Sequence, residues 1–306
     1  MNKWLRAVGF YRGFLLTSFM PVGLGTALAW WQGTVLNWWL AAATMVAVWF
    51  FHAGANLLND YYDHISGTDD INQIQTPFSG GTRVIQEGLL SAEQIRAAGY
   101  FFFVLGGVSF AALSLVAGWW LWALAVFGFF SGWGYTARPV GLAYRGWGEL
   151  LIGLNFGPAL VLTGYFVQTG QLKPVAVWAG VALGLWTAAI ITINQLPDFE
   201  ADKEVGKRTL VVRWGKTFGL RLWAALLYLS LATVVAGVFF GVLPQTFVLA
   251  LLVTPLVVRL VDGSGKAVGN LDANVAACAS TIKLEIVFWA LMMGGLLASR
   301  LPGVMA

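Results

Sequence analysis

Two short stretches of Asp and Asn are the part of this sequence best suited to chemistry. Each contains an Asn, an Asp four residues later and a further Asp about one turn beyond, so on a helix the three side chains share one face. The residues are Asn56, Asp60 and Asp63 in the first stretch and Asn194, Asp198 and Asp202 in the second. Carboxylate and amide oxygens are the ligands of a hard cation, so this pattern predicts a Mg²⁺ site shared with substrate phosphates.

Each acidic stretch follows directly after a long apolar run. Carboxylates at the C-terminus of a helix are unfavourable, because that end of the helix dipole attracts cations and because the carboxylates repel each other. A bound divalent cation would remove both penalties. The alternative is that the acids are solvated loop charges or form ion pairs with Lys203, Lys207 and Arg208. The similarity of the two stretches favours the metal site.

Basic and glycine residues that a diphosphate would need lie in the neighbouring segments. In the segment 77–83, Gly80 and Gly81 would let backbone N–H groups approach phosphate oxygens, although an ordinary turn has the same composition. We predict diphosphate contacts for four cations, with anchoring at the membrane surface as the alternative for each: Arg83, Arg138, Lys207 and Arg208. Tyr62 and Tyr135 are candidates for lining the substrate site, with anchoring at the membrane interface as the alternative.

The composition shows which kind of molecule must hold these residues in place. Of the 306 residues, 58% are hydrophobic and 10% are charged, whereas soluble globular proteins have about 25% charged residues. This excludes a soluble enzyme, a disordered chain and a disulfide scaffold, and no nucleic-acid partner is expected. It predicts a polytopic membrane protein. Because Cys278 is the single cysteine, no internal disulfide is possible and no cysteine metal site is expected.

The apolar runs of the sequence are long enough to be membrane-spanning helices, which need about 20 residues, and too long for buried strands. We predict an all-α membrane bundle of nine spans that forms one domain over residues 1–306. The spans are Phe14–Trp31, Trp38–Leu58, Ala97–Ala117, Trp119–Tyr135, Leu150–Val167, Val175–Ile193, Leu220–Phe240, Leu243–Leu260 and Ile286–Ser299. Only Gly118 separates the third span from the fourth, which predicts a tight helical hairpin. The ninth is short and begins beside Lys283 and Glu285.

The charges of the chain predict its orientation. With the N-terminus in the cytoplasm and nine spans, all of the 18 Lys and Arg residues except Lys173 and Arg300 lie on the cytoplasmic side, in agreement with the positive-inside rule. All 14 Asp and Glu residues lie there as well. We therefore predict a protein of the cell's inner membrane whose cytoplasmic segments, 59–96, 195–219 and 261–283, carry its polar chemistry.

The residues around the acidic stretches resemble those of a known family. The two stretches are similar to the aspartate-rich motifs of the UbiA superfamily of intramembrane prenyltransferases, and within it the sequence is most similar to the 1,4-dihydroxy-2-naphthoate polyprenyltransferases of menaquinone synthesis. The matching segments are 21–27, 59–63, 67–69, 79–83, 135–136, 148–150, 156–158, 198–202 and 206–210. Many superfamily members have a third acid of the first motif at the position of Gly67, so here Asp69 or Asp70 takes that role.

The resemblance implies a nine-helix bundle that opens laterally to lipid, with a cytoplasmic cap built from the inner loops. It implies Mg²⁺-dependent transfer of a polyprenyl group from an isoprenyl diphosphate to an aromatic acceptor, 1,4-dihydroxy-2-naphthoate, with decarboxylation to demethylmenaquinone. Four acids are expected to be catalytic and to hold the metal: Asp60, Asp63, Asp198 and Asp202. Asp69 is a further metal ligand, and Asn56 and Asn194 orient the acids or the diphosphate.

Two other functions are compatible with the same residues. A transferase of this superfamily can act on another acceptor, such as 4-hydroxybenzoate, homogentisate, chlorophyllide or glycerol phosphate. A membrane transporter can use an interrupted helix, here around residues 155–158, as a midplane site. A transporter for a charged solute would carry ionisable groups deep in its spans. The acids of this sequence cluster at one end of the predicted spans, which favours the enzyme.

Overall fold

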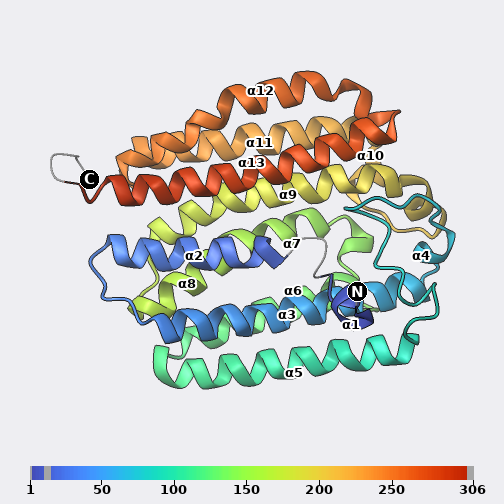
Figure 1. Ribbon diagram of the computed structural model, residues 1–306, viewed down its shortest axis with the longest axis horizontal. Helices are drawn as coiled ribbons and strands as arrows, with labels where there is room; N and C mark the ends of the chain where they lie inside the picture. The colour runs from blue at the N-terminus through green and yellow to red at the C-terminus, as the bar shows by residue number, and fades with distance from the viewer. Residues whose placement is uncertain (1, 10–14, 302–306) are drawn as a thin grey trace.

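The computed structural model describes residues 2–9 and 15–301. This part of the chain is a bundle of long helices that run along the longest axis of the molecule (Figure 1), and among the residues it covers there is no β-strand. The all-α prediction is confirmed.

Within residues 2–9 and 15–301, seven helical segments are long and apolar enough to cross a membrane. Five of them are single helices: α3 (Trp38–Ile65), α5 (Ala92–Ala117), α9 (Pro174–Glu204), α11 (Lys216–Phe239) and α13 (Leu271–Ala298). Two are composite: α7 (Gly148–Leu154), η3 (Asn155–Ala159) and α8 (Leu160–Thr169) form one, and η4 (Gln245–Val253), α12 (Thr254–Gly263) and η5 (Ser264–Val268) form the other. Each overlaps one predicted span, which indicates an integral membrane protein.

The two remaining predicted spans coincide with shorter helices. α2 (Leu15–Trp31) and α6 (Trp120–Thr136) have 17 residues each. Phe14, where the first span was predicted to begin, lies outside the described residues. α5 ends at Ala117 and α6 begins at Trp120, with Gly118 between them at a φ of 114°. The tight hairpin predicted at this glycine is therefore present.

The short elements include α1 (Lys3–Ala7), α4 (Thr68–Ile71), η2 (Ala143–Arg145) and α10 (Leu210–Trp214). In Figure 1, α4 and α10 lie at the end of the bundle where α3 and α9 finish. α4 and α10 therefore lie at the end of the bundle that carries the acidic stretches.

The second acidic stretch is helical, as its spacing predicted, although it lies beyond the predicted span that ends at Ile193. α9 continues through Pro197 and ends at Glu204, just before Gly206 with its φ of 75°. In the same way α3 continues past Leu58 to Ile65, and Gly67 follows with a φ of 83°. Both helices extend beyond the predicted spans, which end where the apolar runs end, and each helix ends near a glycine in the left-handed conformation.

The last helix is twice as long as predicted. α13 has 28 residues and starts at Leu271, because the side chain of Asn270 accepts a hydrogen bond from the N–H of Ala273 at 2.9 Å and so caps its first turn. Lys283 and Glu285 lie inside this helix rather than before it. Glu285 is buried, with 1% of its surface exposed. The expectation that every acid lies outside the spans is therefore wrong for Glu285.

Glycines bring two helical segments into backbone contact on one side of the bundle. A Cβ atom on Gly157 of η3 would meet the carbonyl oxygen of Gly180 in α9, and a Cβ atom on Gly184 of α9 would meet the carbonyl oxygen of Gly153 in α7. Such small residues permit close approach of membrane helices. They fix the spacing of α7 and η3 against α9, the helix that carries the second acidic stretch.

Candidate active site

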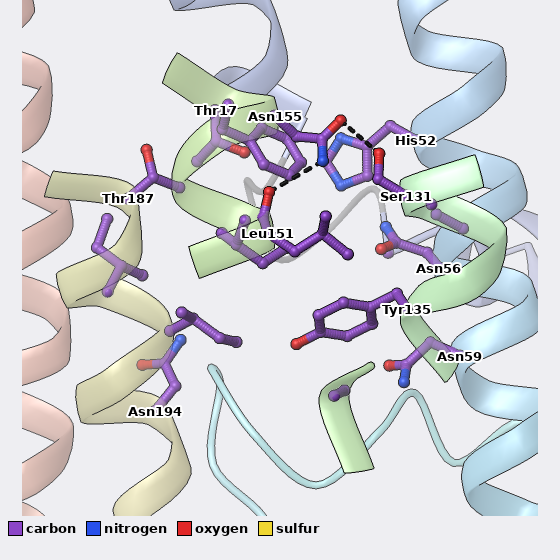
Figure 2. Close-up of a pocket in the computed structure, with 18 of the residues that line it drawn as sticks. Thr17, His52, Asn56, Asn59, Ser131, Tyr135, Leu151, Asn155, Thr187 and Asn194 are labelled. Atoms are coloured by element: carbon purple, nitrogen blue, oxygen red, sulfur yellow. Dashed lines mark hydrogen bonds between the residues drawn. The ribbon is translucent and has the colours of Figure 1, made fainter. Parts of the chain in front are cut away.

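A cavity of about 310 Å³ lies between α3, α6, α7, η3 and α9. All six residues of the two acidic stretches line it: Asn56, Asp60, Asp63, Asn194, Asp198 and Asp202. Figure 2 shows Asn194 on α9 and Asn59 on α3 on opposite sides of this space. The two stretches are far apart in the sequence but face one cavity at the same end of the bundle.

Lys207 connects the two stretches. Its Nζ lies 3.1 Å from Oδ2 of Asp63 and 3.6 Å from Oδ1 of Asp202. Burial by itself lowers the pKa of Lys207, but the carboxylates of Asp202 and Asp63 beside it raise that pKa well above its ordinary value. The side chain is therefore an ammonium ion at neutral pH, and it supplies a fixed positive charge between the two acidic stretches.

Asp60 is held by the segment that follows α4. Thr82 donates a hydrogen bond from its N–H to Oδ1 of Asp60 at 3.3 Å, and its hydroxyl donates to Oδ2. The carbonyl of Thr82 in turn accepts a hydrogen bond from Nε of Arg6 at 3.1 Å. Arg6 belongs to α1 and forms an ion pair with Glu87. The N-terminal helix thus positions an acidic residue of the site through one threonine.

Asp69 is the additional acid that the structure places in the cavity, whereas Asp70 does not line it. Burial, together with the charges of Asp63 and Asp60, raises the pKa of Asp69 to about 8. Asp70 instead lies 3.0 Å from Nδ1 of His64 at the surface. Gly67 starts α4 in the left-handed conformation, and this turn points Asp69 back toward α3.

The neighbours of Asp63 and Asp198 include residues that the sequence did not indicate as site residues. The hydroxyl of Tyr144 donates to Oδ1 of Asp63 at 2.5 Å, and Nδ2 of Asn72 donates to Oδ1 of Asp198 at 2.8 Å. Tyr144 lies in η2 and Asn72 follows α4. Both lie outside the long helices, where no periodicity relates them to the acids, so the sequence carried no signal for them.

Of the four predicted diphosphate contacts, Lys207 alone lines the cavity. Arg138 and Arg208 are exposed. Arg83 donates from Nη1 to the carbonyl of Asp69 and so supports the site from outside. Their contacts with a diphosphate stay predictions. 

The two predicted tyrosines differ in position. Tyr135 lines the cavity, and Figure 2 shows its ring extending from α6 into the space between Asn59 and Asn194. Tyr62 does not line it, because its hydroxyl lies 3.4 Å from that of Tyr100 on α5, away from the acids.

The oxygen atoms of the cavity fit a hard divalent cation. In the described part of the chain, no three His, Cys, Asp or Glu side chains are close enough together to form a preformed metal site. Two buried oxygens of the lining nevertheless have no hydrogen-bond partner, Oδ1 of Asn194 and Oε1 of Gln195. Oδ1 of Asp202 has only its ion pair with Lys207, at 3.6 Å. Mg²⁺ uses few protein oxygens and completes its shell with water and substrate phosphate, so a few oxygens of this lining would be enough to hold it.

The chain matches known proteins over most of its length. Residues 18–261 match the UbiA prenyltransferase family. The chain is 29% identical over 288 residues to the 1,4-dihydroxy-2-naphthoate octaprenyltransferase of Bacillus subtilis, covering 93% of this chain and 89% of that protein. It is 32% identical over 250 residues to the enzyme of the same name from Escherichia coli, covering 79% of each. The solved structure of a UbiA homolog from Archaeoglobus fulgidus bound to GPP and Mg²⁺ has the same fold, with a TM-score of 0.61 at 14% identity over 97% of this chain and 100% of that one.

Proposed function

The chain belongs to the UbiA prenyltransferase family and is a prenyltransferase, and on this premise we propose that its acceptor is 1,4-dihydroxy-2-naphthoate. The donor is an isoprenyl diphosphate, and the ring carboxylate leaves as CO₂ to give demethylmenaquinone in its reduced form. Two relatives named as naphthoate octaprenyltransferases support this acceptor, since each aligns with more than three quarters of the chain. The transporter alternative is not proposed, because the family is one of enzymes.

The observation that carries this proposal is the meeting of two acidic stretches around Lys207 in one cavity. A diphosphate leaves its allylic carbon more readily when its developing negative charge is neutralised. A bound Mg²⁺ supplies such charge, and five residues are those that would hold it: Asp60, Asp63, Asp69, Asp198 and Asp202. Lys207 adds a charge of the same sign from the protein itself, and Asn56 and Asn194 orient the acids or the diphosphate.

The reaction needs no base to remove a proton from the ring carbon, because CO₂ leaves from that carbon instead. The C–O bond to diphosphate breaks, and its electron pair leaves with the diphosphate. The ring carbon that bears the carboxylate forms the new C–C bond, and the electrons of the C–COO⁻ bond restore the aromatic ring as CO₂ departs. Water must be kept from the allylic carbon meanwhile, and Val48, Phe51 and Phe110 provide an apolar lining toward the interior of the bundle.

The proposed topology has nine spans in one domain, with α2 and α6 added to the seven long segments, and with the N-terminus and the site in the cytoplasm. The positions of Lys and Arg support it. The segments around α4, η2 and α10 form the proposed cytoplasmic cap, and the prenyl tail leaves the cavity sideways into lipid of the inner membrane.

The test is a product assay with purified protein in lipid nanodiscs. It contains Mg²⁺, isoprenyl diphosphates of several lengths and a panel of aromatic acceptors, and products are identified by mass. We expect a prenylated naphthalene that has lost the mass of CO₂, and no product after chelation. Asp60→Asn and Asp198→Asn should abolish turnover, while Asp262→Asn, at an exposed site on α12, should leave it unchanged. Prenylation of 4-hydroxybenzoate in preference to the naphthoate would overturn the assigned acceptor.

A further inference from the structure

The cavity extends past the acidic stretches into the interior of the bundle, where three pairs of polar side chains come from different helices. They are His52 with Ser18, Asn155 with Ser131, and Thr187 with Glu285. Figure 2 shows His52, Asn155, Ser131 and Thr187 around the part of the cavity away from Asn59 and Asn194. Polar groups at membrane depth cost free energy, so they are retained for function by default.

His52 presents one ring nitrogen to this part of the cavity. It precedes Asn56 by one helical turn on α3 and therefore shares the face of the first acidic stretch. Its Nδ1 lies 2.5 Å from the hydroxyl oxygen of Ser18 on α2, and the ring meets Phe156 edge-on. Nε2 has no hydrogen-bond partner among the described residues, and His52 lines the cavity. In either tautomer Nε2 can pair with a hydroxyl group, since a hydroxyl both donates and accepts.

Thr187 lies on the opposite wall. It precedes Asn194 by two turns on α9, about 10 Å deeper along the helix axis. Its hydroxyl lies 2.7 Å from Oε1 of Glu285 on α13 and 3.2 Å from the carbonyl of Leu183. Donation to Glu285 leaves the lone pairs of the Thr187 oxygen available to the cavity. Glu285 does not line the cavity, so it acts on a ligand only by orienting Thr187.

An isoprenoid tail has no polar group that would use these side chains, whereas the ring of the acceptor does. Resting on the proposed function, we propose that the interior end of the cavity binds the acceptor ring between His52 and Thr187. The ligand class is an aromatic ring with hydroxyl groups on two opposite sides. One hydroxyl donates to the Thr187 oxygen, and the other pairs with Nε2 of His52. Glu285 and Ser18 are positioning residues for these two contacts.

The experiment pairs the removal of a protein group with the removal of the ring group it contacts. The acceptors are 1,4-dihydroxy-2-naphthoate and its two mono-methyl ethers, each of which lacks one hydroxyl proton. Thr187→Val keeps the shape of the side chain but removes its oxygen. We expect it to raise the KM of the dihydroxy acceptor about fivefold to tenfold, the value of one hydrogen bond, with the KM of the prenyl diphosphate unchanged. One of the two ethers carries its methyl group on the hydroxyl that contacts Thr187. With that ether, Thr187→Val should cause no further rise in KM, because the contact is already blocked.

His52→Gln should give the same pattern with the opposite ether. Thr192→Val is the matched control, since Thr192 is a buried threonine of α9 that does not line the cavity; its acceptor KM should equal that of the wild type. Glu285→Leu should raise the acceptor KM as Thr187→Val does, with no added effect in the double variant. Glu285→Gln should restore the wild-type KM. Thr187→Ser retains the hydroxyl and should keep the wild-type KM, and thermal unfolding shows that each variant is folded.

The outcomes separate this inference from the proposed function. If wild-type protein prenylates the naphthoate and Thr187→Val acts equally on all three acceptors, the ring subsite is wrong and the function stands. If Thr187→Val raises the KM of the prenyl diphosphate instead, the interior end holds the tail and the inference is overturned. If the wild type uses another hydroxylated ring, the acceptor assignment fails, and the same variants measured with that ring and its ethers decide on the subsite. Absence of transfer to any hydroxylated ring overturns both.

Discussion

Nζ of Lys207 lies 3.1 Å from Oδ2 of Asp63, although 144 residues separate them in the sequence. The contact joins the end of α3 to the segment after α9, and Oδ1 of Asp202 lies 3.6 Å from the same nitrogen. Three ionisable side chains with little exposed surface therefore meet at one point, one basic and two acidic. Because buried carboxylates repel each other strongly, this lysine keeps the two acidic stretches together.

Replacement of Lys207 by methionine should remove the charge and keep most of the apolar stem. We expect kcat to fall about 10²- to 10³-fold, the usual loss when one group that stabilises a leaving anion is removed. Lys203→Met is the matched control, because Lys203 is exposed at the end of α9, and it should keep near wild-type kcat. Steady-state kinetics with saturating Mg²⁺ make the comparison. Equal rates for both variants would show that Lys207 has only a structural role.

Thr82→Val should weaken the metal site without touching any proposed ligand. The variant removes the hydroxyl that donates to Asp60, and substitutions that disturb the support of a ligand usually cost about 10- to 100-fold in metal affinity. We expect the Mg²⁺ concentration for half-maximal activity to rise by that factor, while Thr82→Ser stays near the wild type. A Mg²⁺ titration of the initial rate measures this. An unchanged midpoint in Thr82→Val would mean that Asp60 needs no such support.

Gly81→Ala should damage the site more than its backbone strain explains. Gly81 has a φ of 65°, and an added Cβ atom would meet the carboxylate of Asp69. Gly88 in the same segment has a φ of 68°, but a Cβ atom there would meet nothing within 4 Å. Both variants incur the cost of a left-handed alanine, about 1–2 kcal/mol.

We therefore expect similar losses of thermal stability in Gly81→Ala and Gly88→Ala, but a loss of activity of at least about tenfold in Gly81→Ala alone, since an acid displaced by about 1 Å costs up to about 10²-fold. Activity at 25 °C and the midpoint of thermal unfolding separate the two effects. A parallel decline in activity in both variants would show that strain, and not the position of Asp69, is responsible.

Asp69 should make the metal-free protein less stable as the pH rises. Burial and the charges of Asp63 and Asp60 raise its pKa from 3.8 to about 8. A raised pKa in the folded state means that the protonated acid favours folding. The stabilising effect is therefore complete below about pH 4 and is lost as the pH rises toward the folded-state value.

In a chelating buffer we expect the unfolding midpoint of the wild type to fall between pH 6 and pH 9, and Asp69→Asn to be less pH-dependent by roughly 3–5 °C. Asp70→Asn is the control. Partial burial raises the pKa of Asp70, but hydrogen bonds from Gln86 and His64 outweigh this and lower it, so this variant should not flatten the curve. Identical slopes for Asp69→Asn and the wild type would contradict the raised pKa.

The helices and the two acidic faces could be predicted because they follow from regular repeats. Asn56 and Asp60 lie one turn apart on α3, and Asn194 and Asp198 do so on α9, so composition and spacing alone place them together on a face. Glu285 shows where composition fails. It was placed just outside the ninth span because a charge interrupts the apolar run, whereas the structure buries it inside α13, where Thr187 is its hydrogen-bond partner.

The residues around the acids could not be predicted for a different reason. Thr82, Asn72 and Tyr144 lie outside the long helices, and each reaches its acid through a fold of the chain that depends on distant contacts. For Thr82 that contact is with Arg6, 76 residues away. Sequence spacing carries no information on such a pairing, so the residues that support the acids became visible only in three dimensions.

The glycine contacts between η3 and α9 also restrict how the cavity can change shape during evolution. Gly157 and Gly184 leave no space for a larger residue. A single substitution at either position therefore cannot reshape the wall of the cavity formed by η3 and α9. The facing wall can be reshaped by single substitutions, since the side chain of Phe51 on α3 lines the cavity. Related proteins that accept a wider or narrower substrate should therefore differ in the residues of α3 and α6 that line the cavity, while η3 and the adjoining part of α9 keep their small residues.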